Sequence, residues 1–229
     1  MPNYITNRLT IIGSVEQINE VLDYIKIEKD SVEVETYGIG TIDFNKITSM
    51  PKDLDIMSDG HLMPLENEFA KNDPFKTVMD KLRKYYNQNK FDEKTLKNFL
   101  KGCENYVRYG FATWYGWRLE NWGTKWNAYG QPDKRNTLNT IYFETAWSCP
   151  KNLIKKLSKI FPDVEIEIAW ADEDLGSNLG IVKFKDGTAI EKNIPKNQSL
   201  EAKRMFFEIT QDTLEKHNMN ENYEYMEEI

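Results

Sequence analysis

The chain has 229 residues, 40% of them hydrophobic and 29% charged, with a formal net charge of −7 at pH 7. This length can bury a core without disulfide or metal staples, and no apolar run reaches the roughly 20 residues that span a bilayer. The acidic balance disfavours broad binding to a nucleic-acid backbone, which requires a basic surface. The first residues lack a basic stretch followed by an apolar segment, so we expect a cytoplasmic protein with no membrane partner. In that compartment Cys103 and Cys149 should be free thiols.

The chain begins with a predicted strand that leads into a helix. Residues 4–12 are rich in β-branched and aromatic side chains, and Gly13 interrupts them. Ser14 and Gln17 then form the pattern of a capping box, and apolar residues follow at helical spacing. We predict a helix that ends near Lys26.

The next part of the chain predicts a hairpin and an inserted pair of helices. Residues 31–44 alternate in polarity around two glycines, which favours a strand or hairpin. Asp73 followed by Pro74 is typical of a helix start, and Asp92 can cap a second helix. Apolar residues recur at helical spacing after both starts. The inserted helical pair is therefore predicted over residues 73–103.

Four of the six tryptophans lie between residues 114 and 126, where glycines and mixed polarity favour strand and tight turns over helix. Such a segment is either the rigid centre of a fold or a binding platform, and both interpretations remain open here. As a platform, its indoles would stack on a base or ring, its cations would meet phosphate or carboxylate, and its amides would donate hydrogen bonds. The predicted binding residues are Trp114, Trp117, Arg118, Asn121, Trp122, Lys125, Trp126 and Asn127.

The second half of the chain repeats the order of strand and helix. Residues 140–147 alternate as a strand, and Pro150 opens an amphipathic helix. Residues 164–170 and 182–185 alternate again, with glutamates outward in the first and lysines outward in the second, so the two strands should pair. Asp186 and Gly187 predict a tight hairpin turn directly afterwards.

A final helix is predicted from about Leu200, and residues 208–229 form its acidic end and tail. From Glu208 onward, seven acidic side chains face the single Lys216. This composition is typical of a solvated, partly disordered tail. An alternative is an acidic strip that competes for a basic groove on another protein.

Together these elements predict an α+β fold. Two strand-then-helix units, each followed by further strand, fit a ferredoxin-like antiparallel sheet with helices on one face. We predict one elaborated domain over residues 1–229, into which the helical pair is inserted.

The sequence offers no clear catalytic constellation. Residues 172–174 (DED) suggest a cation loop, but an EF-hand would need glycine and glutamate where Ser177 and Lys183 stand. His61 and His217 are not next to any cysteine or nucleophile motif. No dinucleotide fingerprint or P-loop is present, so we predict no metal and no nucleotide cofactor.

Several segments together resemble one known family, the YubB-like ferredoxin-like proteins of phages and plasmids. The resemblance is carried by residues 7–13 (NRLTIIG), 44–47 (FNKI) with 50–51 (MP), 117–118 (WR), 121–127 (NWGTKWN) and 143–148 (FETAWS). It implies a ferredoxin-like fold and an origin in a mobile element, and it implies no particular activity. Cys149 and the acidic tail depart from the shared pattern.

These observations favour a non-catalytic accessory protein that binds a host protein or ribonucleoprotein, such as an inhibitor of a host defence system. One alternative is binding of single-stranded nucleic acid by the tryptophan segment. Another is a metal-dependent hydrolase or nuclease that uses Asp172, Glu173 and Asp174.

Overall fold

The computed structural model describes residues 3–30, 36–58, 62, 75–88 and 92–226. The chain divides into two compact units. Unit 1 comprises Met1–Thr48 and Trp122–Ile229, and unit 2 comprises Ser49–Asn121. Unit 2 contains the two predicted helices and extends beyond residues 73–103 on both sides. The predicted helix start at Asp73 and Pro74 lies outside the described residues.

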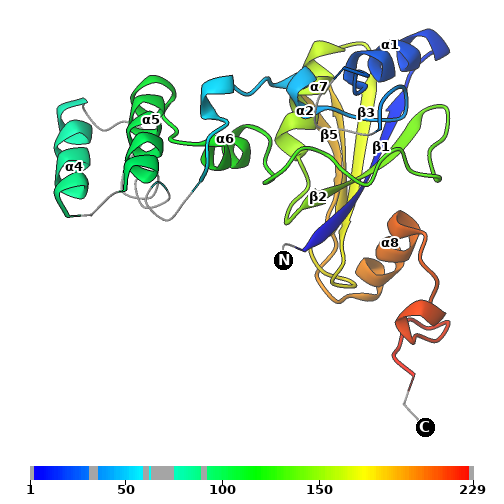
Figure 1. The fold of residues 1–229 in the computed structure, drawn as a ribbon. Coiled ribbons are helices and arrows are strands. Elements are labelled where there is room, and N and C mark those ends of the chain that lie inside the picture. The colour runs from blue at the N-terminus through cyan, green and yellow to red at the C-terminus, as the bar shows by residue number, and fades with distance from the viewer. Residues whose placement is uncertain (1–2, 31–35, 59–61, 63–74, 89–91, 227–229) are drawn as a thin grey trace. The chain divides into compact units, whose positions relative to one another are not determined.

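Unit 1 is built on a five-stranded antiparallel sheet with the strand order β2-β1-β3-β4-β5 (Figure 1). The strands are β1 Tyr4–Ile12, β2 Thr140–Ala146, β3 Glu165–Asp172, β4 Gly180–Lys185 and β5 Thr188–Asn193. The central position of β1, between the two strands that follow it much later in the chain, is the ferredoxin-like arrangement. The predicted α+β class is confirmed.

The first face of the sheet carries the main core of unit 1. The register places Leu9 of β1 opposite Ile141 of β2 and Ile168 of β3, and all three are buried. The helices α1 (Val15–Ile25), α2 (Phe44–Ile47) and α7 (Lys151–Ile160) contribute the other buried side chains of this core. The capping box at Ser14 and the end of α1 before Lys26 are confirmed.

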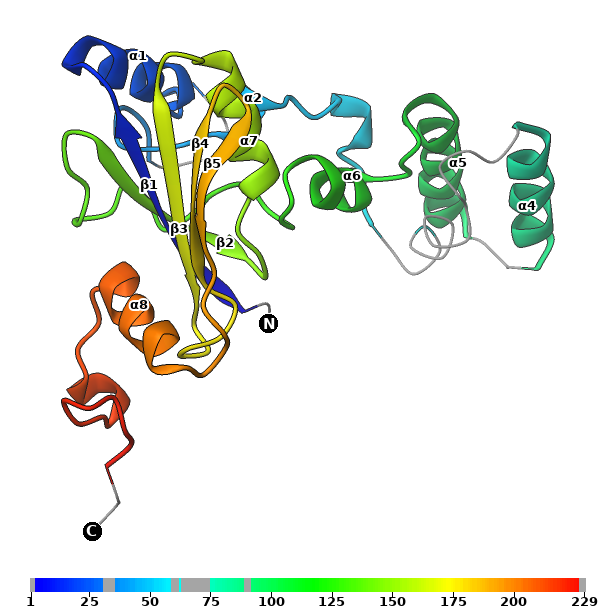
Figure 2. The same cartoon turned by 180° about the vertical axis from the view of Figure 1, so that it is seen from behind.

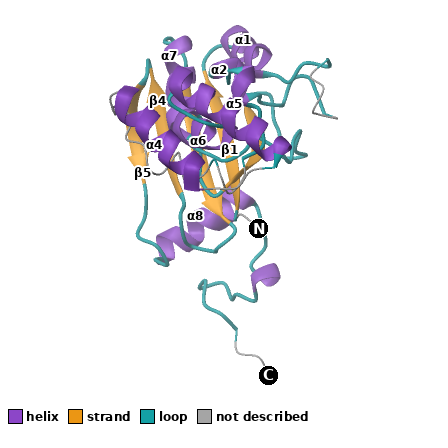
Figure 3. Ribbon diagram, turned by 60° about the vertical axis from the view of Figure 1, so that its left-hand side comes forward, coloured by secondary structure: helices purple, strands orange, loops and turns teal. Residues whose placement is uncertain are grey.

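The helix α8 (Leu200–Thr210) packs on the second face of the same sheet (Figure 3). Ala169 and Ala171 of β3 point to this face, and their small side chains let Phe206 and Ile209 approach closely. The expectation that helices lie on one face therefore holds for α1 and α7, and α8 covers part of the opposite face.

In unit 1 the predicted β4–β5 turn is confirmed, whereas the segment before α2 differs from the prediction. Glu167 faces Lys183 across β3 and β4, as predicted, and the β4–β5 turn has Asp186 and Gly187 at φ 45° and 69°. The strand or hairpin predicted at residues 31–44 is absent from its described part, residues 36–44. There, an isolated bridge joins Gly38 to Ile27 before α2 begins.

The C-terminal segment is folded rather than an unstructured tail. Met219 is only 3% exposed and joins the apolar cluster under α8. The Lys203 ammonium donates a hydrogen bond to the Tyr223 carbonyl at 2.9 Å, and Met219 pairs with Tyr225. Figure 2 shows this segment following α8. Most of the described tail is exposed, as a solvated tail should be, and the buried side chain of Met219 anchors it to the cluster under α8.

Unit 2 is helical. Its described elements are η1 Lys52–Leu54, α4 Phe75–Gln88, α5 Glu93–Tyr109 and α6 Trp114–Asn121. Phe99 and Tyr106 of α5 form a small core with Leu62 and Ala112. Asp92 caps α5 by accepting a hydrogen bond from the Thr95 amide, as predicted.

The tryptophan segment begins as a helix, which corrects the prediction of strand and turns there. Thr113 accepts a hydrogen bond from the Tyr115 amide at the start of α6. Trp114, Trp117 and Arg118 then recur at spacings of three and four, so they meet along the helix surface.

The cysteines and the helix lengths can be compared with the sequence-based expectations. Cys103 and Cys149 are free thiols. None of the described helices is both long enough and apolar enough to pass through a bilayer.

Candidate functional site

The eight predicted binding residues divide between the two units, four in each. In unit 2, Trp114 is partly exposed and Trp117 is only 7% exposed. The Arg118 guanidinium lies over the Trp114 ring at 4.9 Å, and the Asn121 amide donates to the Trp117 carbonyl at 3.0 Å. Trp117 thus belongs to the packing of unit 2, and Trp114 keeps an accessible surface.

In unit 1, Trp122 and Asn127 have structural partners. The Trp122 side chain is fully buried, donates from Nε1 to the Thr48 carbonyl at 2.8 Å, and meets the Phe44 ring edge-on. Asn127 accepts a hydrogen bond from the Phe44 amide at 2.9 Å and donates one to Asp43 at 2.7 Å. Trp122 is therefore a core residue rather than a platform residue.

The remaining predicted residues of unit 1, Lys125 and Trp126, join aromatic side chains that the platform prediction did not include. The Lys125 ammonium lies 4.7 Å from the Trp126 ring centroid and 5.0 Å from that of Trp147. Trp126 meets Tyr129 edge-on at 6.1 Å, and Tyr129 meets Tyr4 at 5.9 Å. We call Tyr4, Trp126, Tyr129 and Trp147 the aromatic strip.

Trp147 has an unusual backbone for a bulky residue. The strand β2 ends at Ala146, not at the predicted residue 147, and Trp147 follows with φ 68° and 40% of its surface exposed. The Ser148 amide donates back to the Ala146 carbonyl at 2.9 Å, so Trp147 is the centre of a three-residue turn. A positive φ at the centre of such a turn is rare and strained, and costs a side-chain-bearing residue about 1–2 kcal/mol. Its amide is held by the Asn3 carbonyl.

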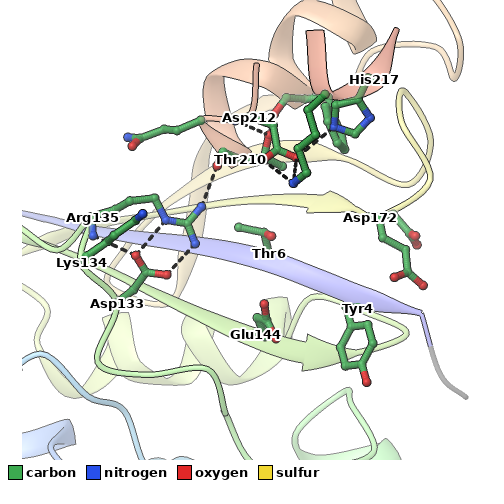
Figure 4. A pocket seen from close by; sticks show the side chains of 14 residues that line it. Tyr4, Thr6, Asp133, Lys134, Arg135, Glu144, Asp172, Thr210, Asp212 and His217 are labelled. Carbon is green, nitrogen blue, oxygen red and sulfur yellow. Dashed lines mark hydrogen bonds and ion pairs between the residues drawn. The ribbon is translucent and has the colours of Figure 1, made fainter. Parts of the chain in front are cut away.

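A cavity of about 680 Å³ opens on the second face of the sheet, next to the aromatic strip (Figure 4). Tyr4 and Thr6 of β1 and Glu144 of β2 form its floor, and the end of α8 forms one wall. The lining residues are Tyr4, Thr6, Asp133, Lys134, Arg135, Glu144, Asp172, Glu173, Phe206, Thr210, Gln211, Asp212, Lys216 and His217.

Two of the cations in this lining are held by carboxylates of the same lining. Arg135 makes a bidentate ion pair with Asp133, at 2.9 and 2.6 Å, and donates to the Thr210 carbonyl at 2.7 Å. Lys216 donates to both oxygens of Asp212, at 2.7 and 2.8 Å. The Arg135 pair holds the pKa of Asp133 below its ordinary value. Figure 4 marks the contacts at Asp133, Arg135 and Asp212 with dashed lines.

Glu144 lines the same cavity, in an environment that is less favourable to its negative charge. Burial raises the pKa of Glu144. Arg135 opposes that rise, and the Asp133 and Glu173 carboxylates add to it. Among the described residues, no hydrogen bond or ion pair reaches its carboxylate. The backbone of Glu144 pairs with that of Tyr129, whose hydroxyl is also buried without a partner in this part of the chain.

The acidic run that suggested a metal site has other partners. Asp172 accepts hydrogen bonds from the side chains of Asn3 and Asn178, at 3.1 and 2.9 Å, and from the Asp174 amide. Among the described residues, no group of three or more histidines, cysteines and carboxylates is arranged to hold a metal ion.

The fold and the site define a ferredoxin-like α+β protein with a partly open sheet face. Residues 125–214 match the family model described as "Ferredoxin-like domain in Api92-like protein". A crystal structure of a protein api92 from Yersinia pseudotuberculosis is similar over 87% of this chain and 100% of that chain, with 12% sequence identity and a TM-score of 0.37. No curated protein matches the sequence.

Proposed function

We propose that this is a non-catalytic binding protein, and that the aromatic strip of unit 1 contacts a protein partner. The observation that carries the proposal is Trp147, a large apolar side chain that a strained turn holds at the surface. Strain of this kind persists where the surrounding structure enforces it, and it is concentrated at functional positions. Exposed tryptophan and tyrosine are also the residue types that contribute most at protein interfaces.

The same surface favours a protein over single-stranded nucleic acid. Stacking platforms for bases combine exposed aromatic rings with a positively charged groove. Here Trp117 and Trp122 are buried, the chain has a net charge of −7, and the cavity beside the strip has more carboxylates than cations. A phosphate backbone would meet repulsion on this face.

We further propose that the partner is a host protein or ribonucleoprotein of a defence system, and that the chain comes from a phage or plasmid. The resemblance of residues 121–127 (NWGTKWN) and of the other shared segments to YubB-like proteins supports the origin. Binding without turnover is how an accessory protein of this kind would block such a target.

Capture of a partner from lysate of the host cell tests the proposal, when the full chain is compared with two tryptophan variants. Trp147→Gly removes the ring at a φ that glycine adopts without strain, so the fold should persist. Trp114→Ala removes a partly exposed ring from unit 2 and is the matched control. The proposal predicts that one defined partner is retained by the wild type and the control and lost by Trp147→Gly. Retention by Trp147→Gly would contradict it.

A further inference from the structure

We propose that the cavity on the second face of the sheet receives a cationic side chain, a guanidinium or ammonium group of a basic protein segment, which meets the carboxylate of Glu144. The inference deepens the proposed function, because it assigns a chemistry to the partner that the aromatic strip would contact. It rests on the charge balance of the cavity, on the state of Glu144 and on the aromatic groups at the rim.

The charge balance of the cavity favours a cation. Five carboxylates line it, against three lysine and arginine side chains. The two shortest ion pairs in the lining, Arg135 with Asp133 and Lys216 with Asp212, balance two charges of each sign. The carboxylates of Glu144, Asp172 and Glu173 then face Lys134 alone. A bound cation would restore the balance, whereas a bound anion would increase the repulsion.

Glu144 is the carboxylate best placed to gain from such a ligand. It is half-buried on the cavity floor, close enough to Asp133 and Glu173 for their charges to act on it. Asp172 is already satisfied by Asn3 and Asn178, and Glu144 has no comparable donor among the described residues. A charged hydrogen bond in a partly desolvated site is stronger than one at the surface.

The aromatic strip accepts an ammonium group within the chain itself. The Lys125 ammonium lies over both Trp126 and Trp147. Tyr4 joins the aromatic strip to the cavity, with 40% of its surface exposed. A cation that reaches Glu144 past Tyr4 would gain a cation–π contact in addition to the ion pair. A cavity of about 680 Å³ falls within the size range of ligand pockets.

Calorimetric titration of the full chain with C-terminally amidated triarginine at low ionic strength tests the inference. We expect saturable binding to the wild type and at least about tenfold weaker binding to Glu144→Gln. Glu191→Gln is the matched control, because it removes one charge from β5, outside the cavity lining. The control should bind within about twofold of the wild type. A thermal melt of each variant checks that it is folded.

Three results would overturn the inference. They are no binding of triarginine to the wild type, equal binding to Glu144→Gln, and binding of spermidine as tight as that of triarginine, which would indicate a free polyamine rather than a protein segment. Failure here is distinguishable from failure of the proposed function. If Trp147→Gly loses the captured partner while Glu144→Gln binds triarginine normally, the strip binds the partner and the cavity does not take its cation.

Discussion

The tryptophans show how residue type alone leaves a role open until the environment is known. Trp122 and Trp126 are four residues apart, yet Trp122 donates a hydrogen bond inside the core, whereas Trp126 is partly exposed and lies under Lys125. An indole suits either place, because it combines a large apolar area with one polar group. The sequence could therefore identify the segment and could not assign its members.

The difference between these roles predicts opposite effects on stability. Trp122→Ala should lower the free energy of unfolding by about 3–5 kcal/mol, because it opens a cavity and removes the partner of the Thr48 carbonyl. Trp147→Ala should change it by less than about 1 kcal/mol, because the ring is exposed and the backbone strain remains. Urea unfolding followed by circular dichroism measures both values. Similar losses for the two variants would show that Trp147 also packs in a core.

The raised pKa of Glu144 predicts a pH-dependent stability. Its pKa lies above the ordinary value of 4.5, so the folded state holds this proton more tightly than the unfolded state does. The charged carboxylate therefore costs stability at neutral pH, and the cost disappears below about pH 4, where both states are protonated. Glu144→Gln should stabilise the protein at pH 7 relative to the wild type, with a smaller difference at pH 3.5. Denaturant titrations at the two pH values measure the free energy of unfolding of both proteins. A stabilisation by Glu144→Gln that is larger at pH 3.5 than at pH 7 would contradict the raised pKa of Glu144.

At the scale of elements, strands and helices with a clear period could be predicted, while local turns and caps were harder to read. The strands β1 to β4 and the helices α1, α5, α7 and α8 follow from alternation, capping residues and apolar spacing. The helix α6 is not predicted, because Gly116 and the mixed polarity of this segment favour turns, although Thr113 caps the helix. Threonine before aromatic residues at spacings of three and four was the signal that could have revealed it.

The candidate site could be predicted only in part, for a similar reason. In β1 the residues Thr6, Arg8 and Thr10 alternate with buried ones, and this polar row indicates a sheet face that is not fully covered. The cavity also requires residues near 133 and near 212, which no pattern along the chain brings together. Trp147 was predicted to continue β2, since nothing in the sequence marks its strained turn.

The β4–β5 hairpin gives a prediction at this scale. Gly187 has φ 69°, and an added Cβ would lie 3.3 Å from the Cβ of Lys159. Gly187→Ala should therefore cost about 1–2 kcal/mol, while Asp186→Gly, which also suits a positive φ, should cost less than about 1 kcal/mol. Thermal unfolding of the two variants provides the comparison. An Ala variant as stable as the wild type would mean that the turn adopts another conformation.

At the scale of the molecule, unit 1 is made of two chain segments whose ends lie together. The Trp122 indole donates to the Thr48 carbonyl at 2.8 Å, so the chain leaves and re-enters unit 1 at neighbouring positions. The sheet and its core are formed entirely by these two segments. Unit 2 has its own small core around Phe99 and Tyr106.

We therefore predict that unit 1 folds without unit 2. A chain in which a short Gly/Ser linker replaces Ser49–Asn121 should keep the sheet, because the cost of closing a short loop between adjacent ends is small. Circular dichroism and dispersed amide resonances would show a folded product. An aggregated or unfolded product would mean that unit 1 depends on unit 2.

Hydroxyl-radical footprinting of the free chain and of its complex with the captured partner tests the central claim most directly. If the aromatic strip is the contact surface, oxidation of Trp126 and Trp147 will fall in the complex while oxidation of Trp114 in unit 2 stays unchanged. If Trp147 is oxidised as fast in the complex as in the free chain, the partner binds elsewhere and the account is contradicted.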